Sequence, residues 1–152
     1  MSIPVELSDL QAKTAEYTWA YLLTVRPDAT PHLVSLSTHW HTADADAGSG
    51  TGDTSMLLMS VSAGTARNAS ACLQVTLCYP PLDHAGYSLI VDGIAEPLEG
   101  ELPAGIDPVP DGKVLLRFEP TGAVLHRSAA PGFSNSATGC ANDCLPVEAS
   151  TD

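Results

Sequence analysis

The chain has 152 residues, of which 44% are hydrophobic and 16% are charged, and its net charge at pH 7 is −12. A chain of this length can bury a core without disulfides or metals, so we expect a single folded domain. Its acidic field repels nucleic acid and anionic membranes, and we exclude both as partners.

The N-terminal sequence MSIPVELSDL is acidic and lacks the basic start and apolar run of a secretion signal. No apolar stretch of the sequence is long enough to span a membrane. We therefore predict a cytoplasmic protein, in which the four cysteines are thiols rather than a disulfide framework.

The first predicted elements are a short helix and a strand. Ser8 to Tyr17 can form the helix, with Ser8 and Gln11 as a capping box. Trp19 to Val25 is the first predicted strand, and the RPDA sequence after it is typical of a turn.

The second predicted strand, Pro31 to His41, alternates between two faces. We expect one face to lie on the core, namely His32, Val34, Leu36, Thr38 and Trp40. The other face begins apolar, becomes polar and suits solvent, a subunit interface or a ligand cleft; it consists of Leu33, Ser35, Ser37, His39 and His41.

A low-complexity stretch over residues 43–54 predicts a loop, and Met56 to Val61 after it form a third strand. The pair Ala63-Gly64 ends this strand. Thr65 can then cap a short Ala-rich helix over residues 66–71, because its hydroxyl can accept a bond from a free backbone N–H.

Arg67 is the only cation between Ser55 and Tyr79, and it lies in the first turn of that helix. The free backbone N–H groups of a helix start favour an anion. A strand that brings an arginine and a helix start to one place suits a phosphate group. A solvated arginine on a surface helix would give the same pattern.

Further strands are predicted at Val75–Leu77, Tyr87–Glu96, Lys113–Glu119 and Ala123–His126, the third of them ended by Pro120. Gly93 within a strand indicates a bulge or a close approach to the backbone. Residues 97–112 predict an irregular crossover, and residues 128–152 an extended or disordered tail. Several short strands with two short helices predict a mainly β protein, a small barrel.

The other reactive side chains give weaker patterns. Cys140 and Cys144 are four residues apart without a second ligand pair, so we predict no metal site there. Cys72 and Cys78 have apolar neighbours and are predicted to be buried. No sequence pattern identifies a catalytic nucleophile, acid or base.

In their order along the chain, AYLLTV, PHLVSLSTHW, LLMSVSAGTARNAS, VTLCYPP, YSLIVDGIAEP and VLLRFEPTGAVLHR resemble the pyridoxamine 5′-phosphate oxidase-like proteins, the flavin-binding split-barrel superfamily. The resemblance covers Leu7 to Arg127. It implies that residues 1–127 form an FMN-binding, six-stranded split β-barrel with short flanking helices. It also implies a homodimer with FMN, or the deazaflavin F420, at the interface, whereas some members bind haem or no cofactor.

The resemblance further implies a set of cofactor-binding residues, in which Thr65 stands where the family often has a lysine. This set is Ser35, Ser37, Ser60, Val61, Ser62, Thr65, Arg67 and Asn68. The expected function is that of a flavin-dependent oxidoreductase of unidentified substrate. The alternative is a module that carries flavin or haem without turnover, or an interaction protein without a cofactor.

Overall fold

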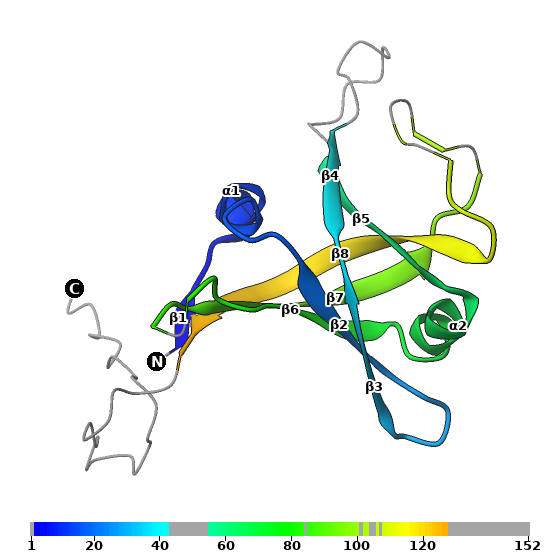
Figure 1. Ribbon diagram of the computed structural model, residues 1–152, viewed down its shortest axis with the longest axis horizontal. Coiled ribbons are helices and arrows are strands. Elements are labelled where there is room, and N and C mark those ends of the chain that lie inside the picture. Colours follow the sequence, from blue (N-terminus) through cyan, green and yellow to red (C-terminus); the bar gives the residue numbers. More distant parts are fainter. Residues whose placement is uncertain are drawn as a thin grey trace, which may run out of the picture.

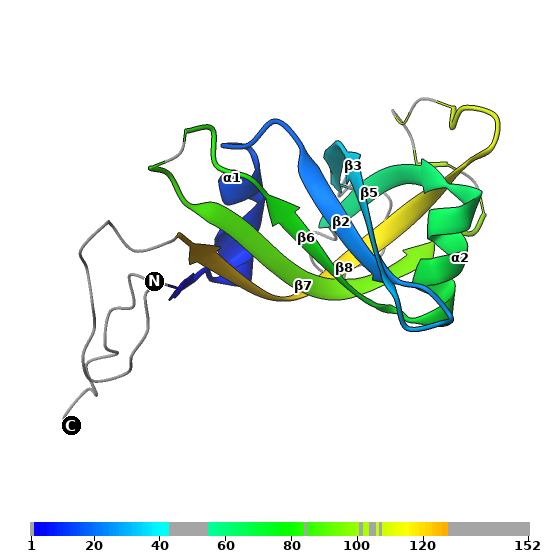
Figure 2. The same cartoon turned by 60° about the horizontal axis from the view of Figure 1, so that its bottom comes forward.

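The computed structural model describes residues 2–42, 55–83, 85–100, 102–103, 106 and 108–127. In this part of the chain the strands form one antiparallel sheet, flanked by two short helices that lie at opposite ends of it (Figures 1 and 2). The strands are β1 (Ser2–Pro4), β2 (Ala20–Val25), β3 (Pro31–Leu36), β4 (Thr38–Thr42), β5 (Ser55–Ser62), β6 (Gln74–Tyr79), β7 (Ser88–Pro97) and β8 (Lys113–His126).

The strand order explains why the sheet closes into a split barrel. β3 and β4 stand at the two ends of the order β3-β2-β6-β7-β8-β5-β4, and β1 pairs with β8 outside this path. Only Ser37 separates β3 from β4 in the chain, so the sheet has to curl until its two ends meet. Figure 1 shows β3 and β4 as one nearly continuous ribbon. The prediction of a mainly β split barrel with short flanking helices is confirmed.

The second predicted strand divides at Ser37 because its two halves have different partners. β3 pairs with β2, and β4 pairs with β5. The predicted alternation nevertheless holds on both sides of the division. The expected core face is half-buried throughout, and four positions of the other face are exposed, namely Leu33, Ser35, Ser37 and His39.

The two last predicted strands are one strand, β8, and Pro120 does not end it. β5 pairs with β8 as far as Phe118, and β1 pairs with it from Val124 onward. Pro120 lacks an N–H donor and lies between these two partners, where that edge of β8 has no strand partner among the described residues. The prediction of a strand end was therefore wrong.

The bulge predicted at Gly93 is confirmed. The register between β7 and β8 shifts between Asp92 and Gly93, which pair with Gly122 and Pro120. A Cβ atom at Gly93 would overlap the ring of Phe118 and come within 2.5 Å of the Glu119 carbonyl oxygen. The close approach of β8 thus leaves room only for glycine.

The first helix is shorter than predicted and has no side-chain cap. A 3₁₀ turn over Leu7–Asp9 leads into α1, Leu10–Thr14, and neither start has a capping hydrogen bond from a side chain. The predicted capping box at Ser8 is wrong because Ser8 lies inside the 3₁₀ turn rather than in front of the helix.

The buried core lies inside the curled sheet and includes Leu22, Leu57, Met59, Leu77, Tyr79, Leu89, Val91, Leu116 and Phe118. Leu10 of α1 and Ala66 and Ala69 of α2 (Ala63–Ala71) belong to the same cluster. Cys72 and Cys78 are half-buried free thiols rather than buried residues as predicted. Cys78 lies on the outer side of the β6 alternation, and Cys72 is the C-cap residue of α2.

Candidate functional site

The junction between β5 and α2 has a different cap from the predicted one. α2 begins at Ala63, and its N-cap is Ser62, whose Oγ accepts the Thr65 backbone N–H at 3.3 Å. Thr65 is only 1% exposed, and its Oγ1 lies 3.1 Å from Ser62 Oγ. The helix starts earlier than predicted and includes Ala63 and Gly64 in its first turn. Thr65 is therefore not the cap; it is buried, and its hydroxyl contacts the hydroxyl of the capping Ser62.

The start of α2 offers backbone donors beside an arginine. By their position in the first turn, the N–H groups of Ala63 and Gly64 have no partner within the helix. Arg67 is exposed, and its Nη2 would lie 3.9 Å from a Cβ atom added at Gly64. Its guanidinium thus folds back toward the helix start, and it has no hydrogen bond or ion pair with any described residue.

A second cation, which sequence reasoning missed, lies beside this helix start. Lys113 of β8 is the direct cross-strand partner of Ser62, and directly opposed side chains lie on the same face of a sheet. Lys113 is exposed and, within the described part of the chain, has no ion pair. No local pattern reveals it, since Ser62 and Lys113 are brought together only by the pairing of β5 with β8.

The other four Lys and Arg side chains are engaged elsewhere. Lys13 pairs with Glu16 at 2.9 Å, and Arg117 pairs with Glu96 at 3.2 Å. Arg26 donates to Thr30 and to a backbone carbonyl, and Arg127 lies over the Tyr87 ring. Arg67 and Lys113 are thus the cations placed to meet an anion at the start of α2.

Four of the predicted residues form a serine row on the outer face of the barrel. The last pair between β4 and β5 joins Thr38 to Met59, so Ser37 and Ser60 come next on the two strands. Both are exposed, and Ser35 and Ser62 follow two residues further along on the same faces, also exposed. The structure thus places Ser37 beside Ser60, whereas Ser35 and Ser62 lie further along β3 and β5, which run apart from this point (Figure 1).

The remaining predicted residues differ in accessibility. Val61 is 3% exposed and points into the core, so only its backbone can meet a ligand. Asn68 is half-buried on α2. In the described ranges no group of three or more His, Cys, Asp or Glu residues could hold a metal ion, and Cys140 and Cys144 lie outside those ranges.

Solved structures of other proteins have the same fold. The structure is similar to that of a candidate pyridoxamine 5′-phosphate oxidase from Listeria innocua, with a TM-score of 0.56, 16% identity and coverage of 79% of this chain and 98% of that one. An FAD-binding protein from Mycobacterium smegmatis (16% identical) and the haem storage protein HutZ from Vibrio cholerae (15% identical) each give a TM-score of 0.53. Both cover 80% of this chain, and each is itself covered to 95%. The chain therefore has the split-barrel fold of the pyridoxamine 5′-phosphate oxidase-like, flavin-binding proteins.

Sequence comparison gives the nearer relatives. Uncharacterised proteins of Mycobacterium bovis and Mycobacterium tuberculosis are each 34% identical to this chain over 141 residues, which is 93% of both sequences. The chain belongs to the same family as these two mycobacterial proteins. No protein-family model matches it. Within the described ranges, none of the helices has the length and apolar character that a membrane span requires.

Proposed function

We propose that this chain binds a phosphorylated flavin-type cofactor on the outer face of its barrel and acts in redox chemistry. FMN is the first choice and F420 the second. The observation that carries the proposal is the meeting of Arg67, Lys113 and the start of α2 at one exposed place in a protein of net charge −12. The FAD-binding protein of M. smegmatis supports it through its similar fold.

The residues at this place fit a phosphate group. Arg67 offers a planar set of N–H donors that matches phosphate oxygens, and Lys113 adds a point charge. The N–H groups of Ala63 and Gly64 supply further donors at the positive end of the α2 dipole. Lys113 also makes up for the cation that is missing at Thr65. The space beside Gly64 is open to a ligand, because the only described side chains within 4 Å of a Cβ atom added there are those of Ser62 and Arg67.

The serine row would hold the remainder of the cofactor. Ser35, Ser37, Ser60 and Ser62 offer hydroxyl donors and acceptors along an exposed surface that leads to the helix start. A bound flavin supplies the electron or hydride transfer, while these residues bind and orient it. No described side chain at this surface stands out as a proton donor or acceptor, so we assign no catalytic residue.

We further propose that a second copy of the chain covers this face. Leu23 and Leu33 are cross-strand partners on the outside of β2 and β3, and they are 37% and 54% exposed. Two large apolar side chains beside Ser35 leave a surface that a lone barrel exposes to water. A homodimer built on this face would enclose the cofactor between two barrels.

Binding of FMN compared with riboflavin tests the phosphate site. A charge-assisted hydrogen bond contributes about 1.5–3 kcal/mol, so Arg67→Ala should weaken FMN binding roughly ten- to a hundredfold. Lys113→Ala should weaken it about two- to fivefold, as expected for about 0.5–1 kcal/mol from an exposed charge. Riboflavin has no phosphate, and neither change should alter its affinity.

Arg117→Ala is the matched control, because Arg117 is exposed and already paired with Glu96. It should leave FMN affinity unchanged. Equal losses for FMN and riboflavin in Arg67→Ala would show that Arg67 has a packing role and would refute the phosphate site. An absorbance spectrum of the purified protein distinguishes bound FMN, F420 and haem from a barrel that carries none of them.

A further inference from the structure

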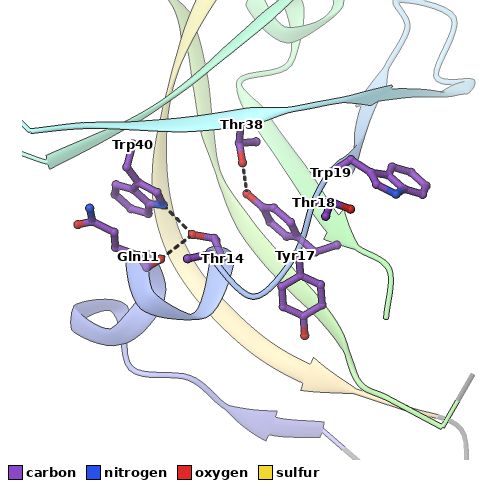
Figure 3. Close-up of a pocket in the computed structure, with 9 residues that line it drawn as sticks. Gln11, Thr14, Tyr17, Thr18, Trp19, Thr38 and Trp40 are labelled. Atoms are coloured by element: carbon purple, nitrogen blue, oxygen red, sulfur yellow. Dashed lines mark hydrogen bonds between the residues drawn. The ribbon is translucent and has the colours of Figure 1, made fainter. Parts of the chain in front are cut away.

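A separate cavity lies between α1 and the inner side of β4. Its volume is about 280 Å³, and Thr38 and Trp40 project from β4 toward the α1 side chains across it (Figure 3). These two residues belong to the core face of their strand, whereas Ser37 and the serine row lie on the opposite face. Gln11 and Thr14 of α1 line the cavity. The two helices α1 and α2 lie at opposite ends of the sheet (Figures 1 and 2).

Aromatic side chains are concentrated at this cavity. The whole chain has two tryptophans, four tyrosines and two phenylalanines. Both tryptophans, Trp19 and Trp40, line the cavity together with Tyr17 and Tyr79. Aromatic rings bind other flat rings by stacked or edge-to-face contacts, in addition to the gain from burying apolar area.

The polar groups of the wall are largely bonded to one another. Trp40 Nε1 donates to Thr14 Oγ1 at 2.7 Å, and Thr14 Oγ1 donates to the backbone carbonyl of Gln11 at 3.0 Å. The Tyr79 and Thr38 hydroxyls lie 2.9 Å apart. These bonds hold the rings in place and leave little need for a ligand with many polar groups.

Two polar side chains at the rim remain available. The Gln11 amide and the Thr18 hydroxyl are exposed and have no hydrogen-bond partner in the described part of the chain. None of the described residues that line the cavity carries a charge. A buried ionic group of a ligand would find no counter-charge there, which disfavours charged ligands.

We infer that this cavity is a second ligand site, for a neutral, flat aromatic molecule of one or two fused rings with a hydroxyl or amide group. Its volume of about 280 Å³ is just below the range typical of small-molecule sites, about 300–1,000 Å³, which limits the ligand to this size. The Trp40 ring contacts the ligand, and Gln11 at one end of the cavity or Thr18 at the other meets its polar group (Figure 3). This site is independent of the proposed flavin site.

The test uses 2-naphthol as the probe and tryptophan fluorescence of the full chain as the readout. Trp40 projects into the cavity, whereas the Trp19 ring at its edge packs against Tyr21, so the part of the signal that comes from Trp40 reports on the cavity (Figure 3). We expect saturable quenching by 2-naphthol. We expect 2-naphthoate, which has the same rings and a negative charge, to bind roughly tenfold more weakly or worse. Quenching that does not saturate, or equal affinity for the two probes, would overturn the inference.

A variant with a larger side chain inside the cavity gives the decisive test. Ala15 lines the cavity, is exposed and is the C-cap residue of α1, so a larger side chain there removes no native contact. Ala15→Phe should weaken 2-naphthol binding roughly tenfold or more, while Ala15→Ser should leave it unchanged. Leu73→Ala, at a 42% exposed position after α2, controls for adsorption to exposed apolar surface and should have no effect. Unaltered binding to Ala15→Phe would refute the site.

Calorimetric titration with 2-naphthol, with and without saturating FMN, separates this inference from the flavin proposal. The affinity for 2-naphthol should be the same in both titrations. Displacement of 2-naphthol by FMN would show one shared site and would contradict the second site. A protein that fails to bind FMN would still be expected to bind 2-naphthol.

Discussion

Replacing Gly93 with alanine tests the close approach of β7 and β8. The added Cβ would overlap the Phe118 ring and crowd the Glu119 carbonyl oxygen, and neither neighbour can move freely. Phe118 is 1% exposed in the core, and the carbonyl belongs to the backbone of β8. Overpacking of this kind costs about 1–3 kcal/mol, and we expect the upper half of this range because part of the obstacle is backbone.

Urea denaturation and thermal unfolding, both followed by circular dichroism, measure this cost as a free energy of unfolding and as a change in Tm. At this chain length 1 kcal/mol corresponds to about 2–4 °C in Tm, so Gly93→Ala should lower Tm by roughly 4–12 °C. Gly122→Ala is the matched control on the other side of the bulge, since a Cβ there meets nothing within 4 Å. Its free energy of unfolding should stay within about 0.5 kcal/mol of the wild type.

A double-mutant cycle identifies the obstacle. In a Phe118→Leu background the ring atoms that meet the new Cβ are gone, so Gly93→Ala should cost less than in the wild type by about 0.5–1 kcal/mol. A cost that does not change would assign the clash to the Glu119 carbonyl alone. Equal stability of Gly93→Ala and Gly122→Ala would refute the reasoning altogether.

The remaining predictions concern the helix cap, a buried phenol and assembly. Ser62→Ala should cost about 1 kcal/mol in urea denaturation because α2 loses its N-cap, whereas Ser60→Ala should change stability by less than about 0.5 kcal/mol. Burial raises the pKa of Tyr79 from 10.0 to about 12. The folded state therefore holds this proton longer than the unfolded state, and the associated stability is complete below pH 10 and is lost as the pH rises through about 12. In a spectrophotometric titration the Tyr79 phenolate should appear last, and Tyr79→Phe should remove that last step; a step near pH 12 that persists would contradict the assignment. Light scattering should give twice the 15.8 kDa mass of one chain, and a monomer mass with and without FMN would contradict the homodimer.

Local patterns predicted the strands and faces that depend on neighbouring residues. The alternation over Pro31–Leu36 and the bulge at Gly93 depend on side-chain period and on the absence of a Cβ, and both are visible in sequence. Whether Pro120 ends its strand could not be predicted in this way. Its effect depends on which strands lie beside it, and the local sequence does not specify them.

The candidate site was predictable to a similar extent. The resemblance pointed to the serine row and to Arg67, and the structure places the serines on one exposed face. The cap was misplaced by three residues, because Ser62 and Thr65 are both good N-cap residues and only the true helix start decides between them. Lys113 was missed because it is next to Ser62 only through the pairing of β5 with β8, and the two residues are far apart in the sequence.

The central place of β8 has a consequence for how the chain folds. β8 is the last described strand, and it pairs with β1, β5 and β7. The contact between Ser2 and His126 spans nearly the whole described chain, and such distant pairings slow folding to the order of milliseconds to seconds. A chain that ends before Lys113 would leave β5 and β7 with unpaired edges, which invite aggregation. During synthesis, this barrel can therefore form only after β8 has left the ribosome.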